Sequence, residues 1–146
     1  MIEVSVLSKL RKRHDDRLIR RAVQAALSDR VGRASVTVVL AGAARMRSLN
    51  RDALGHDYVT DVLTFDYGDS PEGRLCEIVV CPDYAASQAR SFGVPYAQEL
   101  ARYVVHGCLH CTGFDDSNAI KRARMWAAQE AVLRGMFGSR YVAQQQ

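Results

Sequence analysis

Proline, tryptophan and long apolar runs are scarce in this chain, and each scarcity excludes a class of protein. Its 146 residues include 3 Pro, 10 Gly and 1 Trp, a composition that excludes collagen-like and low-complexity chains. No stretch approaches the roughly 20 consecutive apolar residues that a membrane span needs. The first residues alternate apolar and polar before turning basic, the reverse of a secretory signal peptide. We therefore expect a cytoplasmic protein of one domain that does not contact a membrane.

Charge is nearly balanced over the whole chain but is unevenly distributed along it. The net charge is +4; residues 1–51 hold 12 Lys and Arg against 4 Asp and Glu, residues 52–100 hold 2 against 9, and residues 101–146 hold 6 against 3. Segregated charges often form separate faces of a fold, and a basic face beside an acidic cleft suits a polyanion together with a cation. A solvated surface rich in arginine explains any single cluster equally well.

Apolar periodicity predicts one α/β (α+β) domain over residues 1–138 and a frayed tail over residues 139–146. Alternating or β-branched apolar residues predict strands at 2–6, 35–40, 62–67 and 75–81. Apolar residues spaced three and four apart predict helices at 15–28, 43–54, 82–92, 95–112 and 117–136. The expected sheet of about four strands is mixed, because short turns and helical crossovers both occur beside about five helices.

The pattern HGCLH at residues 106–110 carries the clearest chemical signal. Residues four apart lie on the same side of a helix, so the imidazoles of His106 and His110 can reach one ion. Gly113 lets the chain fold back, and Asp116 follows it. Two histidines and one carboxylate leave an open coordination position for water, as in a catalytic zinc site. We therefore expect a metal site of His106, His110 and Asp116 at the end of a central buried helix.

Other interpretations of this segment stay open or are disfavoured by particular residues. The two histidines can also be inert, hydrogen-bonded members of a buried helix. Gly107 stands where zincin peptidases have a catalytic glutamate, which argues against a peptidase of that type. Cys108 and Cys111 have the spacing of a zinc knuckle, but helix geometry turns them away from His106 and into the core. In a cytoplasmic protein we expect buried, reduced thiols at Cys76, Cys81, Cys108 and Cys111.

The run HGCLHCTGFDD at residues 106–116 resembles the signature HGxLHxxGYDH of the YbeY family, whose members are single-domain, metal-dependent endoribonucleases of rRNA maturation. Upstream, Leu49-Asn50, Asp57 and TDVLTF at residues 60–65 are similar to the second block of the family, and LCEI at residues 75–78 is similar to its LGDI-like strand. The order of the elements agrees over nearly the whole chain. The resemblance implies a zinc-dependent, single-strand endoribonuclease that matures the 3′ end of small-subunit rRNA and serves ribosome quality control.

The resemblance also implies partners and a cofactor. rRNA and small-subunit ribosomal particles would be the partners in the cytoplasm, without DNA, and one Zn²⁺ per chain would be held by His106, His110 and Asp116. Basic side chains would follow the RNA phosphates without reading sequence. The candidates for RNA binding are Arg45, Arg47 and Arg51, together with Arg17, Arg20 and Arg21.

Two departures from the family pattern bear on the site. Asp116 occupies the position of the family's third metal-binding histidine. Aspartate is a competent zinc ligand, and it would add one negative charge to the site. Asp115 is the alternative third ligand. Leu54 occupies the position of an arginine that precedes the glycine of the second block. His56, two residues further, is a candidate for the catalytic proton transfer or a phosphate contact, and an exposed loop histidine is the alternative. A metal-bound hydroxide or the RNA 2′-hydroxyl could equally supply the base.

Thr60 and Asp61 lie where a loop enters a strand. We expect them to bond backbone groups there, and a position behind a metal-binding histidine is the alternative for Asp61. Two further functions fit the same residues. One is a ribosome-assembly factor with a structural or weak metal site, and the other is a metallohydrolase of a small molecule or peptide.

Overall fold

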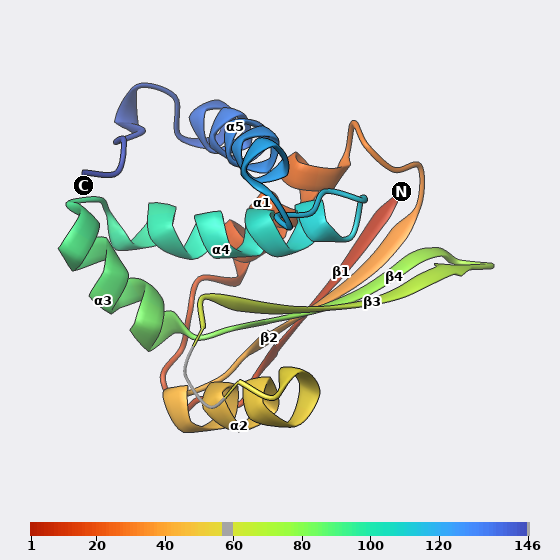
Figure 1. Cartoon of the computed structure of the whole chain (residues 1–146), viewed down its shortest axis with the longest axis horizontal. Coiled ribbons are helices and arrows are strands. Elements are labelled where there is room, and N and C mark those ends of the chain that lie inside the picture. Colours follow the sequence, from red (N-terminus) through yellow and green to blue (C-terminus); the bar gives the residue numbers. More distant parts are fainter. Residues whose placement is uncertain (57–59, 146) are drawn as a thin grey trace.

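The structure is a computed structural model that describes residues 1–56 and 60–145. Four strands form one sheet, with α1, α3, α4 and α5 on one face and α2 on the other (Figure 1). The elements in chain order are β1 (Ile2–Ser8), α1 (Asp16–Leu27), β2 (Ala34–Leu40), α2 (Ala43–Leu54), β3 (Val62–Ser70), β4 (Gly73–Val80), α3 (Pro82–Phe92), α4 (Tyr96–His110), α5 (Ala119–Phe137) and the 3₁₀ turn Gly138–Arg140.

The sheet is mixed, as the sequence predicts. Its order is β1-β2-β4-β3; β1 and β4 run parallel to β2, and β3 runs antiparallel to β4. The connection between the strands predicted at 62–67 and 75–81 is shorter in the structure, because β3 continues to Ser70 and pairs it with Gly73. Gly73 has a φ of 99°, and a Cβ there would lie 2.4 Å from the carbonyl oxygen of Arg33. Only glycine fits this turn without a shift of the backbone.

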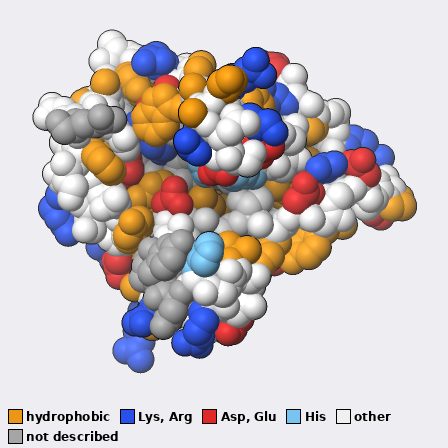
Figure 2. Space-filling view, in the orientation of Figure 1, with side chains coloured by type: hydrophobic (Ala, Val, Ile, Leu, Met, Phe, Trp, Pro, Cys, Tyr) orange, Lys and Arg blue, Asp and Glu red, His pale blue; other side chains and the backbone are white. Residues whose placement is uncertain are grey.

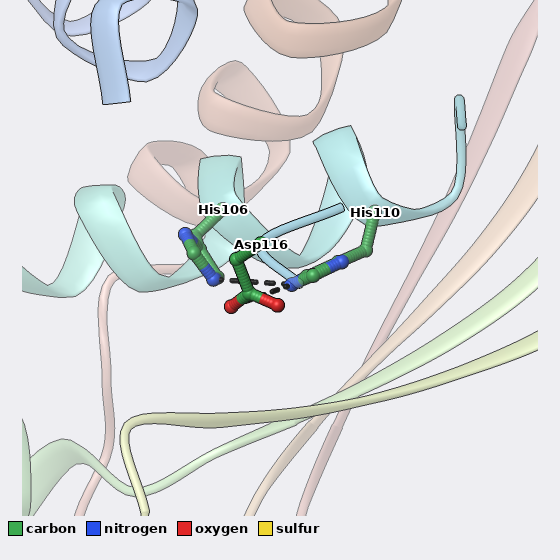
Figure 3. A group of neighbouring side chains, drawn as sticks. All are labelled: His106, His110 and Asp116. Atoms are coloured by element: carbon green, nitrogen blue, oxygen red, sulfur yellow. Dashed lines mark hydrogen bonds and ion pairs between the residues drawn. The ribbon is translucent and has the colours of Figure 1, made fainter. Parts of the chain in front are cut away.

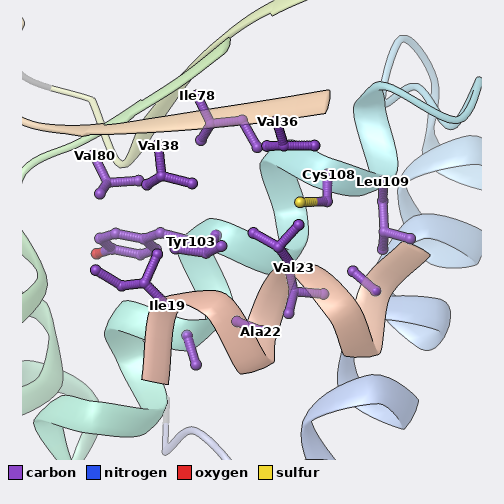
Figure 4. Close-up of a cluster of buried hydrophobic side chains, with 14 of the residues drawn as sticks. Ile19, Ala22, Val23, Val36, Val38, Ile78, Val80, Tyr103, Cys108 and Leu109 are labelled. Carbon is purple, nitrogen blue, oxygen red and sulfur yellow. The ribbon is translucent and has the colours of Figure 1, made fainter. Parts of the chain in front are cut away.

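Two apolar clusters cover the two faces of the sheet. The larger one joins α1 and α4 to the strands, and Figure 4 shows Ile19 and Val23 of α1 and Cys108 of α4 facing Val36 and Ile78 of the sheet. The smaller one includes Met46, with which α2 packs on the opposite face. Local sequence determines where α1 begins and where α2 ends. Asp15 caps α1 by accepting from the backbone N–H groups of residues 17 and 18, and Gly55 ends α2 with a φ of 74°.

Helix α4 runs through the middle of the helical layer. It packs against α1, α3 and α5 and against β3 and β4 (Figure 1). Eleven of its 15 residues are buried, which explains why it is the most apolar helix of the chain. Within the described ranges 1–56 and 60–145, none of the helices combines the length and the apolarity needed to cross a membrane.

The C-terminal residues differ from the frayed tail that the sequence predicts. The backbone N–H of Val142 donates to Oε1 of Gln98 over 2.9 Å, and the side-chain amide of Gln98 donates to the carbonyl oxygen of Val142. The backbone N–H of Gln145 donates to the carbonyl oxygen of Phe92 over 2.9 Å. Residues 141–145 therefore lie along α3 and α4 and pair with a glutamine that is fully buried in α4.

The expectation of four reduced thiols is wrong for two of them. Cys76 of β4 and Cys111, which follows the end of α4, form a disulfide with their Cα atoms 6.5 Å apart. Cys81 and Cys108 are free and buried. The expectation that Cys108 and Cys111 face the core is confirmed, since they are 0% and 1% exposed. The disulfide ties the helix end that carries the two histidines to the central part of the sheet.

Candidate metal centre

His106 and His110 lie one turn apart at the C-terminal end of α4, and Asp116 reaches them from the loop before α5 (Figure 3). The Nε2 atoms of the two histidines are 3.2 Å apart, and Nε2 of His110 lies 4.0 Å from Oδ2 of Asp116. Gly113, with a φ of 98°, turns the chain back toward the helix. One potential ligand atom from each of the three residues lies within 4.8 Å of the other two.

This spacing fits a single divalent ion. Donor atoms that each bind zinc at 2.0–2.2 Å lie about 3–4 Å from one another, and the distances between the imidazoles and from His110 to Asp116 are in that range. The Asp116 side chain is 54% exposed, so it can rotate to improve its approach. The surface beside these three residues is open to solvent. Figure 2 shows a hollow that contains histidine and acidic side chains, with Lys and Arg side chains above and below it.

A hydrogen bond to α5 fixes the orientation of the His106 ring. Nδ1 of His106 lies 2.7 Å from Oε1 of Gln129, and Nε2 of Gln129 donates to Oε2 of Glu130 over 2.9 Å. A carboxylate only accepts, so the amide nitrogen of Gln129 faces Glu130 and its oxygen faces the histidine. Nδ1 of His106 therefore carries the proton, and Nε2 keeps its lone pair on the side of His110.

A buried cluster of Arg102, Glu99 and Glu130 holds the side chain of Gln129 on the side away from His106. Arg102 donates from Nε and Nη2 to Glu130 over 3.0 and 2.8 Å and pairs with Glu99 through Nη1. Burial alone would raise the pKa of Glu130, but hydrogen bonds from Arg102, Tyr141 and Gln129 hold it below its usual range. Glu130 is therefore ionised and can serve only as an acceptor for Gln129.

His110 is held in the neutral form. Burial lowers its pKa, and the neighbouring imidazole of His106 lowers it further, while the carboxylate of Asp116 opposes both effects. A neutral imidazole is the form that binds metals. The local electrostatics thus favour the neutral imidazole, in which one ring nitrogen has a lone pair to offer.

The structure brings Asp116, and not Asp115, to the two histidines. Asp115 instead accepts from the backbone N–H and the hydroxyl of Ser117 over 3.0 and 2.8 Å and pairs with Lys121 at 3.3 Å. Hydrogen bonds from Ser117 lower the pKa of the Asp115 carboxyl. Its oxygens are thus engaged in shaping the loop, and the aspartate closest to the imidazoles is the one that the signature position indicates.

Gly107 faces the sheet and not the hollow. A Cβ there would lie 2.9 Å from Cγ2 of Ile78 and 3.1 Å from Cγ2 of Val62. The position that carries the glutamate in zincin peptidases is therefore packed against β3 and β4. No side chain at residue 107 can act as a base beside the histidines without moving the helix off the sheet.

The other residues singled out from the sequence lie outside this group. Arg45, Arg47 and Arg51 are exposed on α2, on the opposite face of the sheet from α4 (Figure 1), and the exposed His56 follows that helix. On α1, Arg20 and Arg21 donate to the carbonyl oxygens of Val4 and Met136, and Arg17 is exposed. Asp57 lies outside the described residues.

Asp61 bonds a backbone group, as expected where a loop enters a strand, whereas the hydroxyl of Thr60 bonds the side chain of Asp61. Oδ1 of Asp61 accepts from the backbone N–H of Val62 over 2.8 Å and from the hydroxyl of Thr60 over 3.1 Å.

The sequence did not indicate a role for Gln129. The one available signal was the position of Glu130 among the apolar residues of its helix, where a buried charge requires a partner.

Comparison with known proteins agrees with this fold. The family profile described as Endoribonuclease YbeY matches residues 3–136. Endoribonuclease YbeY of Chlorobaculum tepidum is 33% identical over 131 residues, which cover 89% of this chain and 95% of the relative. The enzyme of the same name from Bordetella pertussis is 40% identical over 126 residues, or 81% of this chain and 80% of the relative.

A solved structure shows the same architecture. The solution structure of TM1509 from Thermotoga maritima superposes with a TM-score of 0.65 at 27% identity, covering 94% of this chain and 90% of the other. The two structures therefore match over most of the chain, and the profile match includes the segment with both histidines and Asp116. The chain belongs to the endoribonuclease YbeY family.

Proposed function

We propose that this chain is a zinc-dependent endoribonuclease that cleaves single-stranded rRNA during maturation of the small-subunit 3′ end and ribosome quality control. The observation that carries the proposal is the convergence of His106, His110 and Asp116 within 4.8 Å beside an open hollow. The names of the relatives support RNA as the substrate class. The proposed partners are rRNA and small-subunit ribosomal particles, and the proposed location is the cytoplasm.

The proposed roles follow from the donor atoms present. Nε2 of His106, Nε2 of His110 and a carboxylate oxygen of Asp116 would hold the ion. Zinc bound there supplies Lewis acidity beside a phosphodiester and lowers the pKa of water toward neutrality. Gln129 keeps His106 in the tautomer that offers Nε2. The carboxylate of Asp116 brings one more negative charge than a histidine would, and it reduces the net positive charge of the loaded site.

Two further roles belong to residues away from the ion. Arg45, Arg47 and Arg51 are exposed on one helix and would contact RNA phosphates without regard to sequence. His56 follows that helix and is exposed, so an RNA strand can reach its imidazole for proton transfer. Gly107 leaves no carboxylate between the two histidines, so the candidates for the base remain the His56 imidazole, a metal-bound hydroxide and the 2′-hydroxyl chemistry of the RNA.

The test is metal content measured together with cleavage. Elemental analysis of the wild type is expected to give about one zinc per chain, with loss of the metal in His106→Ala, His110→Ala and Asp116→Ala. Asp115→Ala is the matched control, because this neighbouring carboxylate is engaged by Ser117 and Lys121, and it should keep its zinc. The same proteins are then incubated with a single-stranded RNA from the small-subunit 3′ end.

Cleavage is expected to follow the zinc content. A wild type that takes up no metal even after zinc is added back would reject the nuclease mechanism and favour a ribosome-assembly factor with a structural or weak site. Zinc retained by the Asp116→Ala protein would reject the assignment of that ligand. Cleavage that does not weaken as the salt concentration rises would argue against phosphate contacts by the arginines of α2.

A further inference from the structure

A cavity of about 420 Å³ opens beside the candidate metal centre. Its sides come from α3, α4 and α5, from Thr60 and Asp61 and from Gln144 near the C-terminus, and it shares His106 with the metal group. This volume is within the range of pockets that hold small molecules. A molecule in the cavity would therefore lie directly next to whatever is bound between His106 and His110.

Aromatic side chains line this cavity from three helices. Tyr84 and Phe92 come from α3, Tyr103 comes from α4, and Trp126 comes from α5. Trp126 is 45% exposed, which is unusual for the only tryptophan of the chain, and the guanidinium carbon of Arg102 lies 5.8 Å from its ring centre. Exposed aromatic rings beside a catalytic centre are the surfaces on which unpaired RNA bases stack.

The charge of the cavity wall disfavours phosphate. Three charged side chains line it: Asp61, Glu99 and Arg102. The guanidinium group of Arg102 is engaged by two carboxylates, those of Glu99 and Glu130, so it offers no unpaired positive charge to an incoming anion. With Asp61 added, carboxylates outnumber cations. A flat, uncharged group that donates hydrogen bonds suits this wall better than a phosphate does.

Asp61 supplies an acceptor for such a group. Its Oδ1 accepts from the backbone N–H of Val62 and the hydroxyl of Thr60, which fix the carboxylate in place. In the part of the chain that the structure describes, its Oδ2 receives no hydrogen bond. Adenine, cytosine and guanine carry exocyclic amino groups that can donate to such an oxygen, whereas uracil carries a carbonyl oxygen in place of the amino group.

We propose that this cavity binds one nucleobase of the RNA next to the scissile phosphate, and that Asp61 selects a base with an exocyclic amino group. The base would stack on the aromatic side chains and donate its amino protons to Oδ2 of Asp61. The inference rests on the proposed function, because it takes single-stranded RNA as the substrate. It goes further in assigning a base preference and the residue that determines it.

The fluorescence of Trp126 tests the proposal, since it is the only tryptophan. The full chain is titrated with 2′-O-methyl RNA pentamers of adenine, cytosine or uracil, which resist cleavage, both with zinc and with a chelator. Adenine and cytosine pentamers should change the emission and bind roughly tenfold more tightly than the uracil pentamer, as expected for a hydrogen bond to a charged acceptor. Equal binding of all three pentamers, or no change in emission with any, would overturn the proposal.

Asp61→Asn is the sharpest variant. The asparagine oxygen can keep both bonds that hold Asp61 in place, while an amide N–H₂ replaces the accepting Oδ2. The preference should then shift toward uracil by about tenfold, because the wall now donates where it accepted. Asp83→Asn, a substitution on α3 outside the cavity, is the matched control and should keep the original preference. An unchanged preference in Asp61→Asn would reject the role of Asp61.

Trp126→Ala gives an independent test by fluorescence anisotropy of labelled pentamers. Loss of the stacking surface should weaken binding of the adenine pentamer about tenfold, and undiminished binding would contradict the proposal even if Asp61→Asn failed to fold. Failure of the proposed function is distinguishable from failure here. A chain that discriminates the pentamers in the presence of chelator but never cleaves RNA would reject the nuclease and keep the base site.

Discussion

His106 donates from Nδ1 to Oε1 of Gln129 over 2.7 Å, across the packed helices α4 and α5. The two residues come from different helices, and the bond determines which imidazole nitrogen faces His110. Gln129 is therefore a positioning residue for the proposed metal site, since it would orient a ligand without contacting the ion.

Replacing Gln129 with leucine removes the acceptor and leaves the Nδ1 proton of His106 without a partner. We expect the affinity for zinc to fall about 10- to 100-fold, as measured by competition with a chromophoric chelator. Gln24→Leu is the matched control, because this glutamine is exposed on α1 and donates to the carbonyl oxygen of Ile2, which is not part of the metal site. An unchanged affinity in a folded Gln129→Leu protein would show that the ring orientation does not depend on this bond.

Arg102 pairs with two glutamates that are almost inaccessible to solvent. Glu99 and Glu130 are 1% and 3% exposed, so Arg102→Met would leave two buried carboxylates without a cation. We expect the free energy of unfolding to fall by about 3–5 kcal/mol, as measured by urea denaturation. The triple variant Glu99→Gln/Arg102→Met/Glu130→Gln removes all three charges together and should recover most of that loss. A triple variant as unstable as Arg102→Met would contradict this account.

The same cluster makes stability depend on acid pH. The pKa of Glu130 is held below its ordinary value of 4.5 in the folded chain. A lowered pKa means that the stabilisation is complete above the unfolded value and is lost as the pH falls toward the folded one. The free energy of unfolding should therefore decrease from about pH 5 to pH 3, with a contribution of up to about 1.4 kcal/mol per pH unit from this group.

Glu130→Gln should flatten that dependence, because a neutral amide does not titrate. The comparison is made by urea denaturation of both proteins at several pH values over this range. Equal slopes for the wild type and Glu130→Gln would show that other carboxyl groups account for the acid sensitivity.

Elements bounded by glycine and proline were predicted closely from the sequence. The predicted helices 43–54 and 82–92 coincide with α2 and α3, because Gly55 and Gly93 end them in the left-handed conformation and Pro82 begins the second. The mixed sheet also followed from local patterns. The histidine pair was predictable for the same reason, since a spacing of four on one helix is a local property.

Contacts between distant segments could not be predicted in this way. Gln129 is 23 residues from His106 in the chain, and the pair meets only because α5 packs on α4. Residues 141–145 are held in place through Gln98, whose amide is buried in α4 and bonds the backbone of Val142. The terminal position of this segment predicted fraying, and its buried partner Gln98 is visible only in the folded chain.

Gly107 allows α4 to approach the sheet closely. We expect Gly107→Ala to lower the free energy of unfolding by about 1–3 kcal/mol, because its Cβ would lie 2.9 Å from Cγ2 of Ile78. Gly135→Ala is a matched control within a helix: no atom lies within 4 Å of the Cβ position, so this substitution should stabilise the protein by about 0.5–1 kcal/mol. Stabilisation by both substitutions would contradict the close packing of α4 on β3 and β4.

The disulfide between Cys76 and Cys111 ties the histidine-bearing end of α4 to β4, and it closes a loop with a sequence separation of 35. A loop of this length predicts that the oxidised chain is more stable than the reduced chain by about 3–4 kcal/mol. Urea denaturation with and without reductant measures the difference. Because Cys81 and Cys108 are free, alkylation of the unfolded, unreduced chain should add two labels, and alkylation after reduction should add four.

Four labels without reductant would show that the pair is reduced as isolated. The chain would then be stabilised only by packing at this point, and reductant would leave its unfolding curve unchanged. Zinc affinity adds a second measurement, because Cys111 directly follows His110. If the disulfide restrains the end of α4, the oxidised chain should bind zinc more tightly than the reduced one, since less conformational freedom is lost when the two imidazoles and Asp116 converge on the ion.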